Sequence, residues 1–252
     1  AGVIVAVGAC AKEVAPYVLL VFVVLEVLRW LRRRDGGAAA VRRLAWCVGA
    51  SAVSFIALLW ALEKIVPPYD PQTGKLVSDL PFGEVWRILT YASHQTSPHG
   101  PQGIASYPWD WLVDVKPITY LRIDPAHPTA QLNQIEPAVH FLGMISPPIL
   151  LLLIPAMLFA GLSATGRLFR PRGEVGLVGL AWFLGTYVPF VLLSLLESRT
   201  SYLYYMVIVM PGVYIAVADL VGQIGAGRIV CIAWMAAVFA AVVVMYPFTP
   251  LP

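Results

Sequence analysis

The residues best suited to chemistry gather in one polar stretch that contains Ser106-Tyr107-Pro108-Trp109-Asp110-Trp111. The two indoles, Trp109 and Trp111, can form an aromatic wall against a sugar or a lipid head group. Tryptophan is also common at the lipid–water boundary of membrane proteins, so the same pair can equally be an anchor. His94, upstream in this stretch, has the chemistry of a general acid or base, although a histidine on a polar helix face is often simply solvated.

Two basic residues are candidates for binding a phosphate. Arg199 lies in a short polar turn, Glu197-Ser198-Arg199-Thr200-Ser201, between two apolar runs. Its planar guanidinium suits a phosphate. Lys12 lies between the first two apolar runs and can also meet a phosphate. For both residues an ion pair with a neighbouring acid, such as Glu197 for Arg199, is the alternative.

Many common kinds of site are missing from the sequence. It has no Walker loop, dinucleotide fingerprint or nucleophile elbow, and no zinc-type spacing of histidine and cysteine. Cys10, Cys47 and Cys231 all fall in apolar runs, which favours buried thiols over a disulfide framework. Basic residues lie at the ends of apolar runs and not in a patch with aromatic residues, so no nucleic-acid partner is expected. We expect no metal and no resident cofactor.

Membrane-spanning helices must position these residues. Hydrophobic residues make up 59% and charged residues 12% of the 252 residues, and the mean hydropathy is +0.77. A soluble domain carries about twice that share of charge, so we predict an all-α integral membrane protein. Apolar runs of about 20 residues can each span a bilayer. About six such spans are predicted, at 14–30, 44–62, 139–162, 175–196, 202–221 and 229–246.

Arginines orient the predicted spans. Six of them, at positions 29, 32, 33, 34, 42 and 43, lie in the connection between the first two spans. Connections rich in Lys and Arg stay in the cytoplasm. We therefore expect a multi-pass protein whose segment 63–138, and the turn that carries Arg199, face the extracytoplasmic side. Glu26 and Asp219 fall in or near spans and need a partner or water, and the sequence identifies neither partner.

Segment 63–138 is a long polar loop that divides the chain. It separates an apolar helix tail with two transmembrane helices, residues 1–62, from a four-helix C-terminal domain, residues 139–252. Within the loop, Phe82 to His94 has an apolar stripe at helical spacing, which predicts an amphipathic helix in the membrane interface. Residues 1–11 are too few to span a membrane and are typical of the end of a truncated helix. We therefore expect a fragment of a longer protein.

Two segments of the N-terminal and central chain resemble the C-terminal half of the protein O-mannosyltransferases. These are GT-C-type membrane glycosyltransferases that use a polyprenyl (dolichyl)-phosphate-mannose donor. Gly8-Ala9-Cys10-Ala11-Lys12 is similar to the family's small-residue stretch that ends in lysine ahead of a span. Tyr91 to His94, followed by Ser106 to Trp111, is similar to its Tyr-His and Ser-Pro-Trp-x-x-Trp-Pro element.

Two further segments carry the resemblance almost to the end of the chain. Ser198 to Tyr205, running on to Pro211, looks like the family's Arg-x-x-Phe-x-Tyr-His-Tyr-x-x-Pro element, and Tyr246-Pro247 looks like its closing Tyr-Pro. The chain departs from the pattern in two places. The tryptophans are one residue closer together and are followed by Leu112 instead of proline, and no histidine occurs in the second element. These departures put the acceptor in question.

The resemblance implies an inverting mannosyltransferase that acts at the extracytoplasmic face. A serine or threonine hydroxyl of an acceptor protein attacks the anomeric carbon of the sugar, and the polyprenyl phosphate leaves. The resemblance implies that Arg199, and secondarily Lys12, bind the donor phosphate. It also implies a set of residues that shape the substrate site: His94, Ser106, Trp109, Trp111 and Tyr205.

The same resemblance places the catalytic base in an N-terminal half that this chain does not contain. Neither Asp110 nor Asp114, the nearest acids, is assigned as the base, and the chain alone is expected to be inactive. Membrane lipid and the missing half are the other expected partners. One alternative is a lipid-linked sugar transferase that acts on a glycolipid or polysaccharide. Another is a non-catalytic membrane subunit or half of a transporter. The sequence does not favour transport, because it has no internal repeat and no pattern of polar residues lining several spans.

Overall fold

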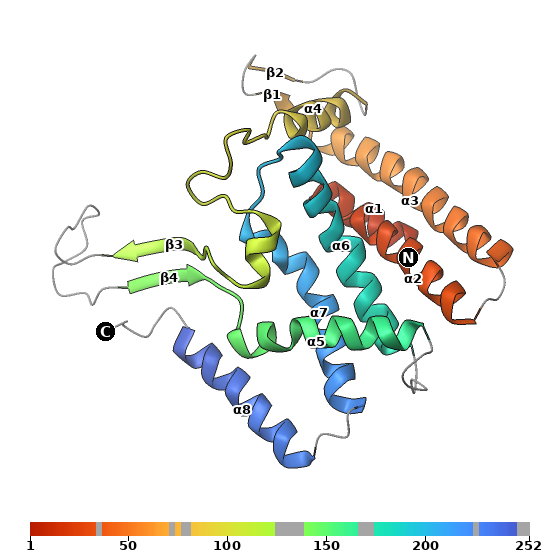
Figure 1. Ribbon diagram of the computed structural model, residues 1–252. Helices are drawn as coiled ribbons and strands as arrows, with labels where there is room; N and C mark the ends of the chain where they lie inside the picture. Colours follow the sequence, from red (N-terminus) through yellow and green to blue (C-terminus); the bar gives the residue numbers. More distant parts are fainter. Residues whose placement is uncertain are drawn as a thin grey trace.

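The computed structural model describes residues 1–33, 37–70, 74–76, 82–123, 139–165, 174–223 and 227–245. Helices make up most of this part of the chain (Figure 1). The α-helices are α1 (Gly2–Ala11), α2 (Tyr17–Arg33), α3 (Gly37–Ile65), α4 (Phe82–Ser93), α5 (Pro147–Ala164), α6 (Val175–Glu197), α7 (Met206–Gln223) and α8 (Arg228–Met245). Two short 3-10 helices are η1 (Pro108–Leu112) and η2 (Leu203–Tyr205).

Two antiparallel hairpins, which the sequence reading did not predict, interrupt the long loop. They pair β1 (Tyr69–Asp70) with β2 (Lys75–Leu76), and β3 (Ile118–Ile123) with β4 (Val139–Gly143). The second hairpin projects from the helices (Figure 1). The predicted third span therefore began too early at residue 139. Pro147 and Pro148 start α5 instead of bending it, because proline suits the first turn of a helix.

Among the described residues, five helical segments are long and apolar enough to cross a membrane: α3, α5, α6, η2 with α7, and α8. They confirm the prediction of an all-α membrane protein in this broader form. The predicted span 14–30 corresponds to α2, which has only 17 residues and carries Glu26 and Arg29. Helix α3 is longer than the predicted span 44–62, since it has 29 residues. The helix predicted at 82–94 is present as α4, and its place in the membrane interface stays a prediction.

Helix α6 forms the centre of the bundle, where α2, α5 and α7 pack on it. Two glycines allow the closest approaches. A Cβ at Gly185 would lie 2.5 Å from the backbone nitrogen of Val21 in α2, and one at Gly179 would lie 2.8 Å from that of Ala216 in α7. Segments 1–62 and 139–252 thus share one packed core through the contact of α2 with α6.

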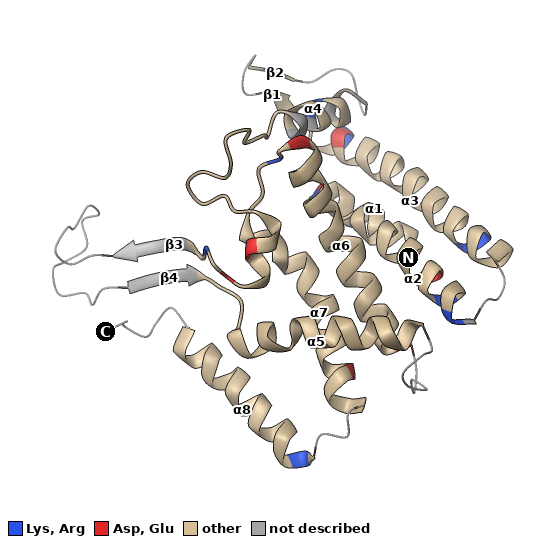
Figure 2. Ribbon diagram, in the orientation of Figure 1, with Lys and Arg blue, Asp and Glu red and all other residues tan. Residues whose placement is uncertain are grey.

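Charged residues collect at the ends of the helices and in the connections (Figure 2). At the end where α2 finishes and α3 begins, Arg29 donates to Glu174, just before α6, with N···O distances of 3.0 and 2.7 Å. Its Nη1 also donates to Glu26 at 3.2 Å. Arg43 of α3 donates to both carboxylate oxygens of Glu26, at 3.1 and 2.7 Å. We call this network of Glu26, Arg29, Arg43 and Glu174 the arginine end.

The structure also gives a partner to Asp219, the other acid that the sequence left unexplained. Its Oδ1 accepts a hydrogen bond of 2.8 Å from Gln223, one turn further along α7. Its Oδ2 lies so close to Gly176, in the first turn of α6, that a Cβ at that position would clash with it. A carboxylate next to a helix N-terminus is favoured by the helix dipole. Glu26 and Asp219 thus both have side-chain partners within the described residues.

Candidate functional site

The long loop is joined to the α6–α7 turn by hydrogen bonds from residues about 100 positions apart. The Ser97 N–H donates to the Ser198 carbonyl at 2.8 Å, and the Thr200 N–H donates to the Gln95 carbonyl at 2.9 Å. The Ser106 N–H donates to the Ser201 carbonyl at 2.9 Å. We call this paired region, residues 95–97 and 106 with residues 198–201, the seam. It anchors the centre of the predicted loop to the helix bundle.

The local sequence explains why the seam forms. Helix α6 ends at Glu197, and Ser198 adopts a left-handed conformation with φ of 51°, which closes the helix and reverses the chain. On the loop side, Gly100 has φ of 90°, which favours glycine. A Cβ there would lie 3.1 Å from the Tyr107 hydroxyl. The two turns therefore place the backbones of the two segments next to each other for pairing.

Trp111 holds the loop against the helix bundle. Its side chain is 1% exposed, and its indole nitrogen donates to the Ser106 hydroxyl at 2.9 Å. The ring packs edge-on against Phe190 of α6, with ring centroids 5.5 Å apart. Tyr187, one turn earlier in α6, donates from its hydroxyl to the Pro108 carbonyl at 3.0 Å. Because η1 is held by these contacts, the residues around it have fixed positions.

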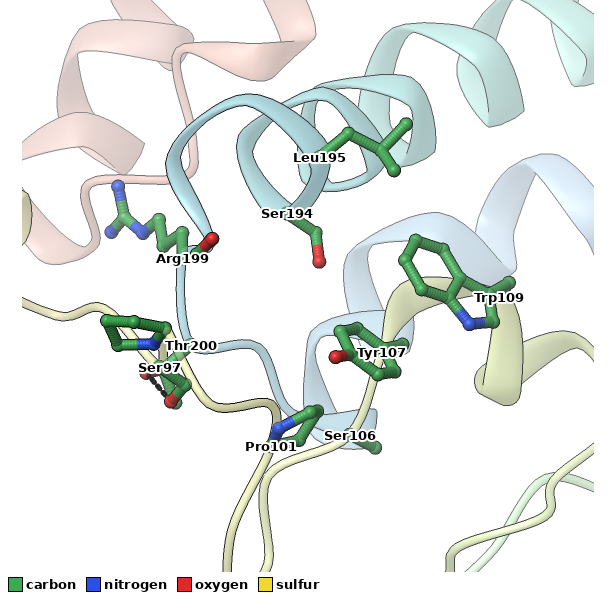
Figure 3. Close-up of a pocket in the computed structure, with 11 residues that line it drawn as sticks. Ser97, Pro101, Ser106, Tyr107, Trp109, Ser194, Leu195, Arg199 and Thr200 are labelled. Carbon is green, nitrogen blue, oxygen red and sulfur yellow. Dashed lines mark hydrogen bonds between the residues drawn. The ribbon is translucent and has the colours of Figure 1, made fainter.

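Residues of the seam line part of a small cavity of about 200 Å³ (Figure 3). Trp109, which is 40% exposed, stacks on Tyr107 with ring centroids 4.5 Å apart and forms one wall. Most of the other lining residues are hydroxyl-bearing side chains and prolines: Ser97, Pro98, Pro101, Ser106, Ser194, Ser198 and Thr200, together with Leu195 and Arg199. A pocket with one aromatic wall and several hydroxyls suits a small polar ligand that has an apolar face.

Arg199 lies at the edge of this cavity. Its guanidinium points away from Trp109, toward the ribbon of the N-terminal helices (Figure 3). The charges of Arg199 and Glu13 both act on the Tyr17 hydroxyl, and the charges of Lys12 and Glu13 both act on the Tyr204 hydroxyl. Glu13 is thus the acid whose charge is felt by both tyrosines.

The alternative of a salt bridge between Arg199 and Glu197 is not found. Within the part of the chain that the structure describes, the Arg199 side chain forms no ion pair or hydrogen bond. Its backbone is fixed, because its N–H donates to the Leu193 carbonyl at 3.2 Å and it pairs with Thr96 across the seam. The site thus holds a positioned cation whose donors are available to a ligand.

The structure brings together only some of the predicted site residues. Ser106, Trp109 and Arg199 line one cavity, and Lys12 is not among its lining residues. Tyr205 stacks on Phe190 with ring centroids 4.8 Å apart, below the cavity and not in its lining. Trp111 does not form the expected wall, because it is buried in the core and its indole N–H is committed to Ser106.

His94, the histidine predicted to shape the site, lies outside the cavity. His94 is exposed just after α4, with Nδ1 2.7 Å from the Thr90 carbonyl oxygen, and it does not line the cavity. His127 lies outside the described residues, and the side chain of His140 in β4 is not described either. The expectation that His94 shapes the site therefore has no support from the geometry of this cavity.

Eight lining residues were not predicted from the sequence: Ser97, Pro98, Pro101, Tyr107, Ser194, Leu195, Ser198 and Thr200. One of them had a detectable signal, since Ser194 and Ser198 are four residues apart and face the same side of a helix end. Ser97 and Thr200 could not be linked from sequence, because their hydroxyls meet at 2.7 Å across a separation of 103 residues.

Neither acid near the tryptophans faces the cavity. Asp110 accepts the Tyr107 N–H at 3.1 Å and thereby caps η1. Asp114 accepts the Ile145 N–H at 3.1 Å, so it ties η1 to the segment before α5. Burial raises the pKa of the Asp114 carboxyl, and the hydrogen bond from Ile145 opposes that shift. Both acids have structural roles here, in agreement with leaving them unassigned as a base.

Comparison with known protein families, with curated protein sequences and with solved structures finds no match to this chain. The function must therefore be argued from the geometry of the cavity and of its charged edge.

Proposed function

We propose that this chain is part of a membrane glycosyltransferase that moves mannose from a polyprenyl-phosphate donor to serine or threonine hydroxyls of proteins. One observation carries the proposal. The seam brings the aromatic wall of Trp109 and the residue Arg199, which lies at the edge, to one small cavity, although the two are far apart in sequence. A sugar phosphate needs both features, an apolar face for the ring and a cation for the phosphate.

The cation would act on the leaving group. When the bond between the anomeric carbon and the phosphate oxygen breaks, negative charge develops on the polyprenyl phosphate. Arg199 offers a planar fork of donors to that charge, and Lys12 adds a second positive charge from the end of α1. Glu13 lowers the net charge of this group to about one positive charge.

The size of the cavity limits the sugar. Sites for drug-sized ligands occupy roughly 300 Å³ or more, whereas this cavity has about 200 Å³. It therefore suits one monosaccharide unit, with the C–H face of the ring on the indole of Trp109. The hydroxyls of Ser194 and Thr200 are close enough to the wall to bind sugar hydroxyls (Figure 3).

The transfer itself needs a group that takes the proton of the acceptor. The acceptor oxygen forms a bond to the anomeric carbon, the phosphate leaves from the opposite face with its electron pair, and the configuration inverts. A carboxylate is the expected proton acceptor. The carboxylates of Asp110 and Asp114 are used in backbone hydrogen bonds away from the cavity. We therefore propose that the base comes from a part of the enzyme outside this chain.

The proposed orientation places the seam on the extracytoplasmic side. The excess of arginine between α2 and α3 supports it, since basic connections stay in the cytoplasm. Single cysteines introduced at Gln102 and at Arg228, with the native cysteines replaced, test this. In intact cells, a membrane-impermeant maleimide should label the first position and not the second. The opposite pattern would reverse the topology.

Donor binding tests the site without requiring transfer. The full chain in nanodiscs would be titrated with polyprenyl phosphate and with polyprenyl-phosphate mannose. Arg199→Gln should weaken both ligands about tenfold or more, because it removes charged hydrogen bonds worth ~1.5–3 kcal/mol. Trp109→Ala should weaken only the mannosylated ligand. Arg228→Gln and Trp60→Ala are matched controls, with the same residue types removed elsewhere, and should bind as the wild type does.

Two results would overturn this assignment. Unchanged affinity of Arg199→Gln would exclude the phosphate role, and equal losses for both ligands in Trp109→Ala would exclude the sugar role. The acceptor is tested separately, in the enzyme reconstituted with the part that supplies the base. Transfer to a Ser/Thr peptide supports protein mannosylation, whereas transfer only to a glycolipid would replace it with the alternative acceptor class.

A further inference from the structure

The connection between α2 and α3, next to the arginine end, holds more positive charge than the nearby acids can neutralise. Glu26 and Glu174 pair with Arg29 and Arg43 in the network described above. The same connection contains four more arginines and only one more acid, Asp35: Arg32, Arg33, Arg34 and Arg42. An excess of about three positive charges is therefore concentrated between residues 29 and 43.

The ion pairs fix one arginine and leave its neighbour available. Arg43 uses Nε and Nη2 for Glu26, while its side chain is still 59% exposed, so its Nη1 donors can reach another acceptor. Arg42 is exposed and, within the described ranges, has no hydrogen bond or ion pair. Glu26, whose side chain is only 12% exposed, acts as the fixed support for this pair.

The length of α3 places these arginines at the depth of a lipid head group. Its 29 residues, at about 1.5 Å each, give a helix of roughly 43 Å. That equals the thickness of a bilayer including its head groups, of which the hydrocarbon core takes about 30 Å. Trp46, 75% exposed, follows Arg42 by one turn, where an aromatic residue marks the boundary of the core.

The surface beneath the arginines can accept a lipid chain. Helix α3 packs on α1 and α2, and almost all of its apolar span is exposed. Val41, Trp46 and Val48 form exposed apolar surface next to Arg42. A phospholipid whose phosphate binds at Arg42 and Arg43 would thus have its acyl chains beside an apolar helix face.

We propose that the start of α3 is a binding site for the phosphate of an anionic phospholipid in the adjacent leaflet. Arg42 and the free donors of Arg43 bind the head group, and the exposed face of α3 takes the chains. The Glu26 network holds Arg43 in position and ties the occupied helix to α2 and α6. This inference does not depend on the proposed transferase activity, because it uses the opposite end of the bundle.

The test compares phosphatidylglycerol with phosphatidylcholine on the purified full chain. Native mass spectrometry counts the lipids that stay bound, and thermal unfolding in detergent reports their stabilising effect. Phosphatidylglycerol should bind more strongly to the wild type, and Arg42→Gln should lower its affinity about fivefold, which corresponds to ~1 kcal/mol per basic residue. Arg42→Lys should retain most of the affinity. Arg228→Gln, an exposed arginine at the start of α8, should retain all of it.

The measurements on the wild type separate lipid from free phosphate, and they decide the question even if a variant does not fold. If phosphatidylglycerol and phosphatidylcholine bind equally to the wild type, or if Arg228→Gln loses as much as Arg42→Gln, the proposal is wrong. Stabilisation by inorganic phosphate equal to that by phosphatidylglycerol would also overturn it, in favour of a soluble anion. In the wild type, binding of phosphatidylglycerol should fall as NaCl rises from low to high concentration, while binding of phosphatidylcholine should not. No such salt dependence would contradict the proposal as well.

Discussion

The two ends of the helix bundle use arginine in opposite ways. At the arginine end, Arg29 and Arg43 each donate at least two hydrogen bonds to carboxylates, and these join α2, α3 and the start of α6. At the seam, backbone hydrogen bonds join the segments, and no acid pairs with Arg199 within the described residues. The first end is held together by charge, whereas the second is held by its backbone.

This difference separates a structural arginine from one that can bind a ligand. A guanidinium such as that of Arg29, which uses all three of its nitrogens for carboxylates, has little to offer an anion, and removing it takes a partner from a partly buried acid. A guanidinium whose position is fixed by the main chain can be removed without such a penalty. The contrast therefore predicts which substitutions lower stability and which lower only binding.

The largest expected effect is at the tryptophan that supports the seam. Trp111→Ala removes a fully buried indole and its hydrogen bond to Ser106, and should lower the free energy of unfolding by about 3–5 kcal/mol. Trp109→Ala removes a partly exposed ring and should cost about 1 kcal/mol or less. Thermal unfolding followed by circular dichroism compares the two. Equal losses of stability would show that the two residues are not divided between core and cavity.

The next effect contrasts the arginines directly. Arg29→Gln removes one cationic partner from Glu174 and one from Glu26, and should lower stability by about 1–2 kcal/mol. Arg199→Gln should change stability by less than about 0.5 kcal/mol, since its side chain makes no contact that folding requires. Thermal unfolding of both variants in the same detergent is the measurement. A greater loss in Arg199→Gln would remove the distinction between the two ends.

Helices and their order could be predicted because their physical signal is local. Apolar runs of membrane length gave α3, α6, α7 and α8 close to their observed positions, and the period of residues 82–94 gave α4. The β3–β4 hairpin was missed because Val139 to Gly143 is apolar and continues into the apolar helix α5. A short apolar run does not distinguish a strand from the start of a helix.

The site was predictable by residue type but not by contact. Trp109 and Arg199 stood out as an exposed aromatic and an unusual cation in polar turns, and both line the cavity. Trp111 was interpreted like Trp109, because two residues of separation in an irregular loop do not indicate which ring is buried. Ser97 and Thr200 meet only through the seam, and pairing between distant loops leaves no local pattern.

A smaller effect is expected from one hydroxyl of the seam. Thr200→Val keeps the shape of the side chain but removes its hydrogen bond of 2.7 Å with the Ser97 hydroxyl, so the seam should lose about 1 kcal/mol. Hydrogen exchange at the Ser97 and Thr200 amides should become faster by about fivefold, because local opening becomes easier. Thr165→Val, which removes an exposed hydroxyl after α5, is the matched control. Unchanged exchange in Thr200→Val would mean that the backbone bonds alone hold the seam.

The smallest expected effect concerns Asp114, which links η1 to the segment before α5. Burial raises its pKa in the folded state above the unfolded value, so the folded protein binds the proton more tightly. Its contribution to stability is therefore greatest below the unfolded pKa and is lost as the pH rises through the folded pKa. Asp114→Asn should abolish this dependence and slightly stabilise the protein at neutral pH, because asparagine can still accept the Ile145 N–H and tolerates the observed φ of 52°.

Thermal unfolding of the wild type and Asp114→Asn between about pH 3 and pH 7 separates this effect from those of the other acids. The difference in stability between the two proteins should shift in favour of the wild type as the pH falls. Asp110→Asn is the control, since it alters the neighbouring cap of η1 and should leave the pH dependence due to Asp114 in place. A difference that is constant with pH would mean that Asp114 is charged in the folded state as readily as in the unfolded chain. The link between η1 and α5 would then be an ordinary surface hydrogen bond.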